Sequence, residues 1–532
     1  MDAPDKGRTV VLGIDSLDLV LVQRWAAEGL LPFFDSMLRN CSLARLSVVS
    51  RVLQGALWPT LLTGHSPGRH GSFYLTQLTS GTYELDQVTA DRGAPQPYYG
   101  ELDSNGLRCA IVDIPNDVPI AGFKGLHVVD WLTEFQSWRF ATQPATSQRE
   151  IEDQLGTLNK SGGYGPTQDS LEGHRNLRRK LEQSLAMKTA LTSGLLQRTD
   201  LDHIFVVFAE PHKAGHFLWK YMDQSHPDHV EADPYLRDGL LGIYQLLDRQ
   251  LEQLSGQLTA RDNFVVLADH GMQANYRGDQ FVGPILEKLG LCGSGRALRL
   301  DGSSSDSPAP GAGARRLGGR IRSAVRSVIN ATAPAALRRA LRRRFGAAAR
   351  IDWSQVKVFQ LPTDRNSYLR INLRQREPEG IVSRGGEYAA LLSLLEREFR
   401  ALINVATGKP AVEEVFRVHE LYPGPRVDDL PDLAILWSSD APINAVESPR
   451  LGRLEIRAVE DRSGNHRAEG FLLARGPGIQ PGVTNLYGDI LQVPATLLAL
   501  HGLCVPDHYD MPPLHGLLTG AHDVRSEPSR AA

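Results

Sequence analysis

The sequence predicts an α/β fold in which a large, mostly parallel β-sheet is flanked by helices. Short apolar runs rich in β-branched and aromatic residues recur along the 532-residue chain, and such runs are typical of strands buried on both faces of a parallel sheet. Segments with apolar residues at intervals of three and four positions lie between them, as in amphipathic helices. Strands that alternate with helices imply a mainly parallel sheet.

Six apolar runs are the predicted strands. They are Thr9–Ile14, Arg108–Val112, His203–Phe208, Asn263–Ala268, Asp432–Trp437 and Gly470–Ala474. Two of the predicted helices are Asp238–Leu254 and Tyr388–Leu402. Functional groups gather just after the carboxyl ends of parallel strands. The polar residues that follow the first, third and fourth runs are therefore candidate site residues.

The composition excludes several classes of protein. A formal net charge of −3 argues against a surface built for nucleic acid, so no stable nucleic-acid complex is expected. The four cysteines are far apart and predict neither a disulfide framework nor a thiolate zinc site. The N-terminus lacks the pattern of a signal peptide, and no run reaches the roughly 18 apolar residues of a membrane span. A cytoplasmic location is expected.

One segment departs from the α/β pattern. Residues 302–313 are rich in Ser, Pro and Gly and predict a flexible loop, and residues 314–350 are rich in arginine without any acidic residue. A solvated basic insertion is the favoured interpretation. A site for an anionic substrate, lipid headgroups or nucleic acid is the alternative, so membrane contact through this segment is not favoured.

Histidine and aspartate residues form the candidate metal-binding set. His212 and His216 stand four residues apart, a spacing that places both imidazoles on one face of a helix. Asp269 and His270 follow one predicted strand and Asp15 follows another, while His466 precedes the last predicted strand. Each residue alone is weak evidence for a metal site, but the combined set is strong.

The order of these motifs resembles the alkaline phosphatase superfamily, in the branch of type I phosphodiesterases and nucleotide pyrophosphatases. The resemblance rests on VVLGIDSLD, the block from Trp58 to Gly71, FAEPHKAGHFLW, LADHGM, GNHRAEGFLLARGPGI and the C-terminal segment that begins at Asp489. It covers most of the chain apart from the basic segment. The resemblance implies hydrolysis or transfer at a phosphate ester, above all a phosphodiester or nucleotide pyrophosphate. The expected partner is therefore a small phosphate ester or a nucleotide.

The resemblance also implies two divalent metal ions. Zinc is expected, with manganese or magnesium as alternatives. One ion would be held by His212, His216 and His466, and the other by Asp15, Asp269 and His270. Position 212 is usually aspartate in the family, and a set of three neutral imidazoles makes zinc a stronger Lewis acid.

The position of the nucleophile departs from the family pattern. A Thr or Ser ten residues before Gly64 is expected, but this chain has Gln54, and an amide is a poor nucleophile. Three interpretations remain open: Ser50 or Thr60 supplies the hydroxyl, a metal-bound hydroxide attacks while Gln54 orients the substrate, or the protein binds a phosphate ester without turnover. A sulfatase or phosphonate hydrolase is a further alternative.

The domain prediction places the metal-dependent core in residues 1–275 and 431–532. Residues 276–430 form a cap, which includes the Arg-rich segment 314–350. The polar run Thr363–Asn366 falls where the family's variable cap selects the substrate, with a solvated loop as the simpler interpretation.

Glu210 is expected either to bond a ligand imidazole or to be an ordinary surface acid.

Overall fold

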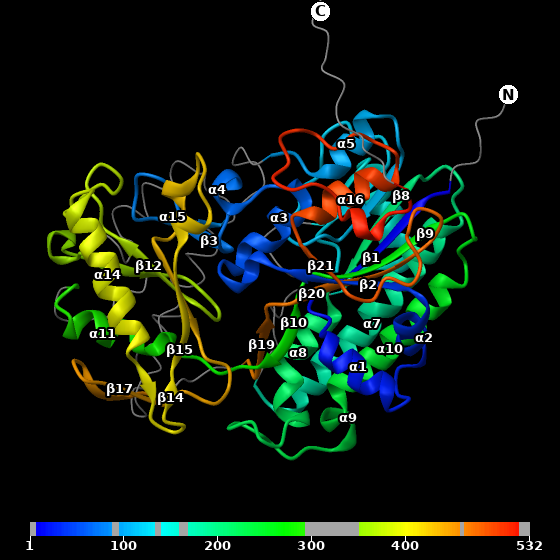
Figure 1. Cartoon of the computed structure of the whole chain (residues 1–532). Coiled ribbons are helices and arrows are strands. Elements are labelled where there is room, and N and C mark those ends of the chain that lie inside the picture. Colours follow the sequence, from blue (N-terminus) through cyan, green and yellow to red (C-terminus); the bar gives the residue numbers. More distant parts are fainter. Residues whose placement is uncertain are drawn as a thin grey trace, which may run out of the picture.

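The computed structural model describes residues 7–87, 95–132, 140–158, 169–292, 351–457 and 462–520. The predicted loop at 302–313 and the Arg-rich segment 314–350 lie outside these residues. A nine-stranded sheet forms the centre of the molecule (Figure 1). In spatial order its strands are β21 (Leu486–Asp489), β2 (Ser42–Ser47), β20 (Gly470–Arg475), β9 (Asn263–Ala268), β1 (Thr9–Ile14), β8 (His203–Phe208), β5 (Cys109–Val112), β6 (Leu126–Val129) and β7 (Ala141–Gln143).

All strands of this sheet except β20 and β7 run in one direction, so the predicted α/β fold with a mostly parallel sheet is confirmed. The strands β1, β8 and β9 at its centre are fully buried, as their unbroken apolar runs predict. Along β1, Val10 and Leu12 pack into one hydrophobic cluster and Val11 into another, because successive side chains point to opposite faces.

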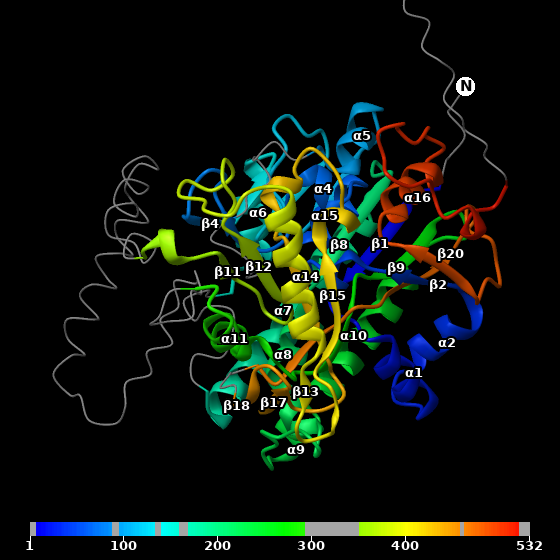
Figure 2. The ribbon, with the colours of Figure 1, turned by 60° about the vertical axis from the view of Figure 1, so that its left-hand side comes forward.

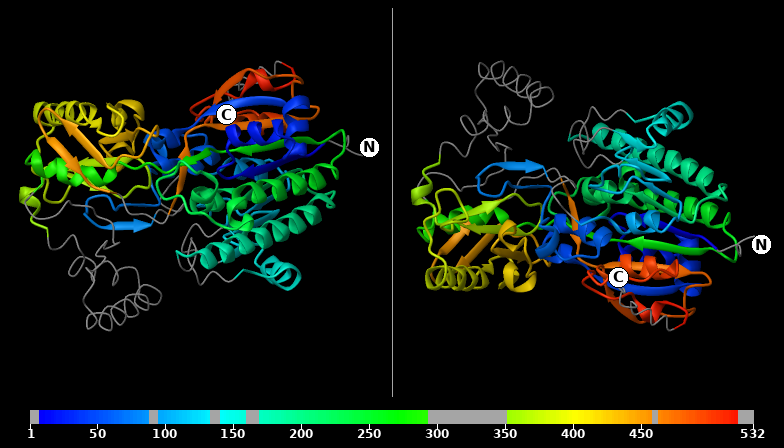
Figure 3. Two further views of the ribbon diagram at one scale, coloured as in Figure 1. Left: turned by 90° about the horizontal axis from the view of Figure 1, so that it is seen from below. Right: turned by 90° about the horizontal axis from the view of Figure 1, so that it is seen from above.

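Helices cover both faces of the central sheet (Figures 1 and 3). The cluster on one face includes residues of α1 (Leu19–Ala27), α2 (Pro32–Asn40), α7 (Leu171–Leu196), α8 (Glu210–Met222) and α10 (Gly239–Ser255). The cluster on the other includes residues of α3 (Leu57–Thr63), α5 (Tyr98–Ser104) and α16 (Gln492–Leu500). Shorter elements of this part are α4 (Pro67–His70), α6 (Thr146–Leu155), α9 (Pro234–Arg237), β3 (Thr76–Leu78), β4 (Leu85–Gln87), β10 (Gly271–Ala274) and β19 (Gly464–Arg467).

A second, antiparallel sheet lies beside the first, with α14 (Gly386–Arg400) and α11 (Val282–Lys288) packed in its core (Figure 2). Its strands, in spatial order, are β11 (Val358–Leu361), β12 (Ser367–Ile371), β16 (Leu433–Trp437) and β15 (Val412–Arg417). A small third sheet contains β14 (Lys409–Pro410), β13 (Ile403–Asn404), β17 (Ala445–Ser448) and β18 (Gly452–Glu455), and a short helix α15 (Val418–Leu421) follows β15.

The prediction for Asp432–Trp437 was wrong in one respect. The run forms a strand, β16, but it pairs antiparallel with β12 and β15 in the second sheet and not with the central sheet. An apolar run indicates burial on both faces and carries no information about which strands lie beside it. The predicted division at residue 430 stays a prediction, although β16, β17 and β18 follow that boundary and β16 and β17 pair with strands that precede it.

Within the described ranges, none of the helices has the combination of length and apolar character that crossing a bilayer requires.

Candidate metal centre

Three neighbouring strands end at the same level and bring the candidate carboxylates together. The last residue of β1, Ile14, is in register with Phe208 at the end of β8 and with Ala268 at the end of β9. Asp15 and Asp269 are therefore the first residues beyond the sheet on adjacent strands. This arrangement follows from parallel strands whose carboxyl ends share one edge.

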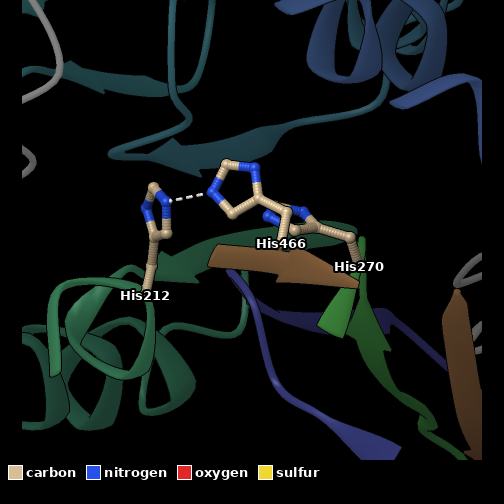
Figure 4. Close-up of side chains that lie close together, drawn as sticks. All are labelled: His212, His270 and His466. Carbon is tan, nitrogen blue, oxygen red and sulfur yellow. Dashed lines mark hydrogen bonds between the residues drawn. The ribbon is translucent and has the colours of Figure 1, made fainter. Parts of the chain in front are cut away.

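The candidate imidazoles reach this edge from a helix and a two-stranded ribbon. Helix α8 begins shortly after β8, with Pro211 in its first turn, where its missing N–H is tolerated. It carries His212 and His216 one turn apart, as the four-residue spacing predicts. His466 lies on β19, which pairs antiparallel with β10 so that His466 is opposite Met272. Figure 4 shows His212 and His466 pointing toward each other, with His270 beside them.

The Nε2 atoms of three histidines converge on one point. The distance from His212 Nε2 to His466 Nε2 is 2.8 Å, and that from His212 Nε2 to His216 Nε2 is 2.9 Å. The third side of the triangle, from His466 Nε2 to His216 Nε2, is 3.2 Å. Nitrogen ligands at about 2.0–2.1 Å from a tetrahedral zinc ion would lie about 3.3 Å apart. The three imidazoles are thus close to the spacing of a metal-ligand set.

Hydrogen bonding among these three nitrogens cannot account for all three contacts. His216 Nδ1 donates to the carbonyl oxygen of Gly464 at 2.7 Å, so a neutral His216 has no proton on Nε2. Burial lowers the pKa of His212, His216 and His466 well below the usual value, and all three are therefore neutral at neutral pH. A contact between two ring nitrogens is a hydrogen bond only when one of them carries a proton and the other a lone pair, so three neutral imidazoles cannot form all three contacts as hydrogen bonds. A cation at the centre would satisfy all three.

A second cluster consists of Asp15, Asp269 and His270. One ligand atom from each lies within 4.8 Å of the others, and all three residues are buried. His270 Nδ1 is 2.9 Å from Asp269 Oδ2. Although burial lowers the pKa of His270, the carboxylates of Asp269 and Asp15 raise it above its usual value. Burial raises the pKa of Asp15 to about 6, and that of Asp269 is also raised.

The two clusters are contiguous. His212 Nδ1 lies 3.3 Å from Asp15 Oδ2, and the rings of His270 and His466 have centroids 4.3 Å apart. His212, His270 and His466 also form a close group by themselves. A pair of buried His/Asp clusters at this spacing is consistent with the binuclear metal site of phosphate-transferring enzymes, in which two ions lie about 3.5–4 Å apart.

One family of known proteins matches more than half of this chain. The model of the family described as type I phosphodiesterase / nucleotide pyrophosphatase matches residues 9–315. The chain belongs to this family. The predicted relationship to the alkaline phosphatase superfamily is thereby confirmed. No curated protein is similar enough to this chain to match it.

Several solved structures share the fold. Phosphonoacetate hydrolase from Sinorhizobium meliloti 1021, in complex with phosphonoacetate, is 13% identical with a TM-score of 0.52, over 93% of this chain and 95% of that chain. Murine ectonucleotide pyrophosphatase/phosphodiesterase 5, inactive and in complex with AMP, is 12% identical with a TM-score of 0.46, over 94% and 96% of the two chains. The human protein of the same name is 11% identical with a TM-score of 0.46, over 96% and 100%. At these identities the likeness concerns the fold alone.

Gln54, at the nucleophile position that the sequence predicts, is held by two hydrogen bonds in the short helix Gln54–Ala56. Its main-chain N–H donates to the hydroxyl of Tyr368 at 2.8 Å, and its side-chain oxygen accepts from the main-chain N–H of Arg365 at 3.1 Å. The polar run Thr363–Asn366 therefore packs against Gln54. Thr363, Arg365 and Asn366 are buried, so the solvated-loop interpretation of this run was wrong.

The two alternative hydroxyls contact neither metal-ligand cluster by a hydrogen bond within the described part of the chain. Thr60 Oγ1 lies 3.0 Å from His70 Nε2, and His70 Nδ1 accepts from the main-chain N–H of Ser72. The proton of His70 is consequently on Nε2 and is donated to Thr60. Ser50 Oγ is buried without a hydrogen-bond partner among the described residues.

A hydroxyl that sequence reasoning missed lies inside the second cluster. Ser16 Oγ is 2.7 Å from His270 Nε2 and donates to Asp15 Oδ1 at 3.3 Å, while its main-chain N–H donates to Asp269 Oδ1 at 3.0 Å. Its φ of 61° lies in the left-handed region, which costs a non-glycine residue about 1–2 kcal/mol. The only sequence signal was its place directly after Asp15.

Glu210 bonds neither a ligand imidazole nor solvent. Its Oε1 accepts from the hydroxyl of Ser184 and lies 3.6 Å from the Nζ of the fully buried Lys188, which is also 3.1 Å from Asp113 Oδ2. Burial lowers the pKa of Lys188, but the attraction of the two carboxylates outweighs it and raises the pKa overall. Glu210 thus joins a buried ion cluster under the first turn of α8, and both expectations for it were wrong.

A cavity of about 230 Å³ lies beside Gly55. Its walls include Gly55, Pro59, Leu62, Tyr74 and Asn116. Gly55 directly follows Gln54, so this cavity provides space for an organic group beside that residue.

Proposed function

We propose that this chain is a two-metal hydrolase of phosphate esters whose substrate is a phosphodiester or a nucleotide pyrophosphate. The observation that carries the proposal is the convergence of three Nε2 atoms, from His212, His216 and His466, whose mutual contacts hydrogen bonding cannot explain. Membership of the phosphodiesterase family supports the same reaction class.

The side chains present fit two divalent ions. The three neutral imidazoles would hold one ion, and zinc is the ion that three histidines favour. Asp15, Asp269 and His270 would hold the other, and the two carboxylates in that set also suit manganese or magnesium. When bound, such a pair of ions activates an attacking oxygen and stabilises charge on the phosphoryl group and the leaving oxygen.

The attacking group in this proposal is water and not a side chain. Gln54 has no acidic proton to lose, and Thr60 accepts a hydrogen bond from His70. The proposed role of Gln54 is to orient the substrate, because its side-chain amide is fixed by the main-chain N–H of Arg365 and its main chain by the hydroxyl of Tyr368. The cavity beside Gly55 is the proposed place of one organic substituent.

Metal analysis combined with a hydrolysis assay tests the proposal. The protein is stripped with a chelator, reloaded with zinc and desalted, and its metal content and its turnover of bis(p-nitrophenyl) phosphate are then measured. We expect two ions per chain and metal-dependent release of p-nitrophenol. Two ions without turnover on a broad panel of phosphate esters would instead identify a phosphate-ester-binding protein. Turnover confined to sulfate esters or phosphonates would favour the sulfatase or phosphonate hydrolase alternative.

The stereochemistry at phosphorus tests the water nucleophile separately. A single direct displacement inverts a chiral thiophosphate diester, whereas a covalent phospho-enzyme followed by hydrolysis retains its configuration. We expect inversion. Net retention would show that a side chain of the protein attacks first.

A further inference from the structure

Arg365 is a buried cation without a bonded partner. Arg365 is only 8% exposed. Its guanidinium makes no hydrogen bond and no ion pair with any residue in the described part of the chain. Burying a charged group without a partner is costly. Two other buried arginines of the second sheet are paired: Arg370 contacts Glu377 at 2.7 Å, and Arg376 contacts Asp432 at 2.7 Å.

The charges near Arg365 do not neutralise it. Burial lowers its pKa to about 10, Glu413 opposes this effect, and Arg467 and Arg51 add to it. Glu413 is itself paired with Arg51, at 3.0 Å. Arg467 is paired with Asp18, at 3.0 Å. With a pKa of about 10, the guanidinium of Arg365 remains a cation at neutral pH.

Gln54, which accepts a hydrogen bond from the main chain of Arg365, presents a second unused donor. Its Oε1 accepts the main-chain N–H of Arg365, which only an oxygen can do, so the orientation of the carboxamide is settled by its own hydrogen bond. The Nε2 atom on the other side of the amide is buried and has no hydrogen-bond partner among the described residues. Both unused groups, the guanidinium and this amide nitrogen, can only donate.

The loop that carries Arg365 lies against the three-imidazole cluster. The main-chain oxygen of Asp364 accepts from Asn465 Nδ2 at 3.4 Å, and Asn465 directly precedes His466 on β19. The carboxylate of Asp364 lies 3.3 Å from Arg462, and the charge of Arg462 contributes to the low pKa of His216. The loop that carries Arg365 thus borders the candidate metal centre.

We propose that Arg365 and Gln54 form a subsite that binds an oxyanion of the substrate. The inference rests on the proposed function and extends it, because it names the group that the nucleophile position recognises. A ligand with acceptor oxygens and negative charge is the one chemistry that meets both donors and neutralises the guanidinium. The oxyanion belongs either to the reacting phosphoryl group or to a second anionic group of the same substrate.

Titration with inorganic phosphate tests the subsite without requiring turnover. The zinc-loaded wild type is compared by calorimetry with Arg365→Met, and Arg51→Met serves as the matched control, since Arg51 is a neighbouring arginine that is half exposed and paired with Glu413 and Glu414. We expect the dissociation constant for phosphate to rise about tenfold or more in Arg365→Met. In Arg51→Met it should change less than about twofold.

The melting temperature separates a binding role from a structural one. Replacing an unpaired buried charge by an apolar side chain of similar length is neutral or stabilising, so Arg365→Met should melt at the wild-type temperature or above it. A clear fall in melting temperature with unchanged phosphate binding would overturn the proposal. Gln54→Glu provides a second variant, because it replaces the amide donor by a charged acceptor, and it should weaken phosphate binding similarly.

Two substrates distinguish the source of the oxyanion. Bis(p-nitrophenyl) phosphate carries its single charge on the reacting phosphorus, whereas ATP carries further phosphates. If Arg365→Met loses kcat/KM on both, the subsite binds the reacting phosphoryl group, and if the loss is confined to ATP, it binds a second anionic group. Equal kcat/KM for variant and wild type on both would overturn the subsite. A wild type that turns over neither substrate would contradict the proposed function, while the phosphate titration would still test the subsite.

Discussion

The Nε2 atoms of His212 and His216 lie 2.9 Å apart, one helical turn from each other on α8. Neutral imidazoles repel at this distance unless a proton or a metal ion lies between them, and the hydrogen bond from His216 Nδ1 to Gly464 removes the proton from one side. Metal-binding histidines characteristically donate their second ring nitrogen to a carbonyl or a carboxylate. His216 is therefore oriented as a ligand before any ion arrives.

The variant His216→Ala should lose one of the two metal ions. It removes one of three nitrogen ligands, and two imidazoles hold zinc far less tightly than three. We expect the zinc content after desalting to fall from about two ions per chain to about one, and the hydrolysis rate to fall at least about a hundredfold. Elemental analysis and the p-nitrophenol assay measure the two effects.

The matched control for this variant is His229→Ala. His229 is half-buried, and its Nδ1 donates to the carbonyl oxygen of Lys220 at 2.8 Å, away from both clusters. This variant should keep both ions and the wild-type rate. Equal zinc contents in His216→Ala and His229→Ala would contradict the assignment of His216 as a ligand.

The variant His212→Asp should bind zinc more tightly and turn over more slowly at neutral pH. It introduces the residue type that the resemblance to the family implies at this position, and its negative charge both attracts the ion and weakens its Lewis acidity. We expect slower removal of zinc by a chelator, and an acidic limb of the rate profile displaced to higher pH. A variant that loses zinc faster than wild type would show that the shorter aspartate cannot reach the ion.

The central strands and the closeness of the candidate His and Asp residues were predictable from the sequence, because both depend largely on local patterns. The runs at Thr9–Ile14, His203–Phe208 and Asn263–Ala268 coincide with β1, β8 and β9. Parallel pairing then places the residues that follow them at one edge. The four-residue spacing of His212 and His216 likewise needs only a helix, and α8 provides it.

The environment of Gln54 could not be predicted, because it depends on contacts between distant parts of the chain. Gln54 and Arg365 are 311 positions apart, and their hydrogen bond requires the loop between β11 and β12 to fold back onto the central sheet. No periodicity marks such a contact. The position of the Ser16 hydroxyl could not be predicted for another reason. A serine after a strand is common, and the sequence does not reveal the left-handed backbone at Ser16 or the contact of its hydroxyl with His270.

The variant Gln54→Thr should change the stereochemical course of the reaction. It places a hydroxyl at the predicted nucleophile position and removes the amide that accepts from Arg365. We expect net retention at phosphorus and a phosphoryl group on the new hydroxyl, detectable by mass spectrometry after acid quenching, against inversion and no phosphoprotein for the wild type. Gln54→Ala is the control, since it removes the amide without adding a hydroxyl. Inversion in all three proteins would show that a hydroxyl at position 54 does not act as the nucleophile.

The variant Asp432→Asn should destabilise the second sheet, which holds the Arg365 loop. Asp432 is buried, and its two carboxylate oxygens lie 2.8 and 2.7 Å from the guanidinium of Arg376. It also accepts from the hydroxyl of Tyr388 at 2.8 Å. Removing the charge leaves buried Arg376 without this partner, and the loss of one member of a buried pair costs about 3–5 kcal/mol. Urea denaturation measures the change in unfolding free energy.

The pH dependence of this effect has a defined sign. Burial raises the pKa of Asp432, but the attraction of Arg376 outweighs burial and holds it below its usual value. A carboxyl group with a depressed native pKa stabilises the fold above about pH 4 and loses this contribution as the pH falls further. The difference in unfolding free energy between wild type and Asp432→Asn should therefore be full at pH 7 and shrink below about pH 4.

Asp428→Asn is the control, because its ion pair with Arg384 at 3.2 Å is exposed and contributes about 0–1 kcal/mol at any pH. A difference for Asp432→Asn that grows toward acid pH would mean that the carboxyl group is protonated in the native state, and that hydrogen bonds alone hold β12 and β16 at this point.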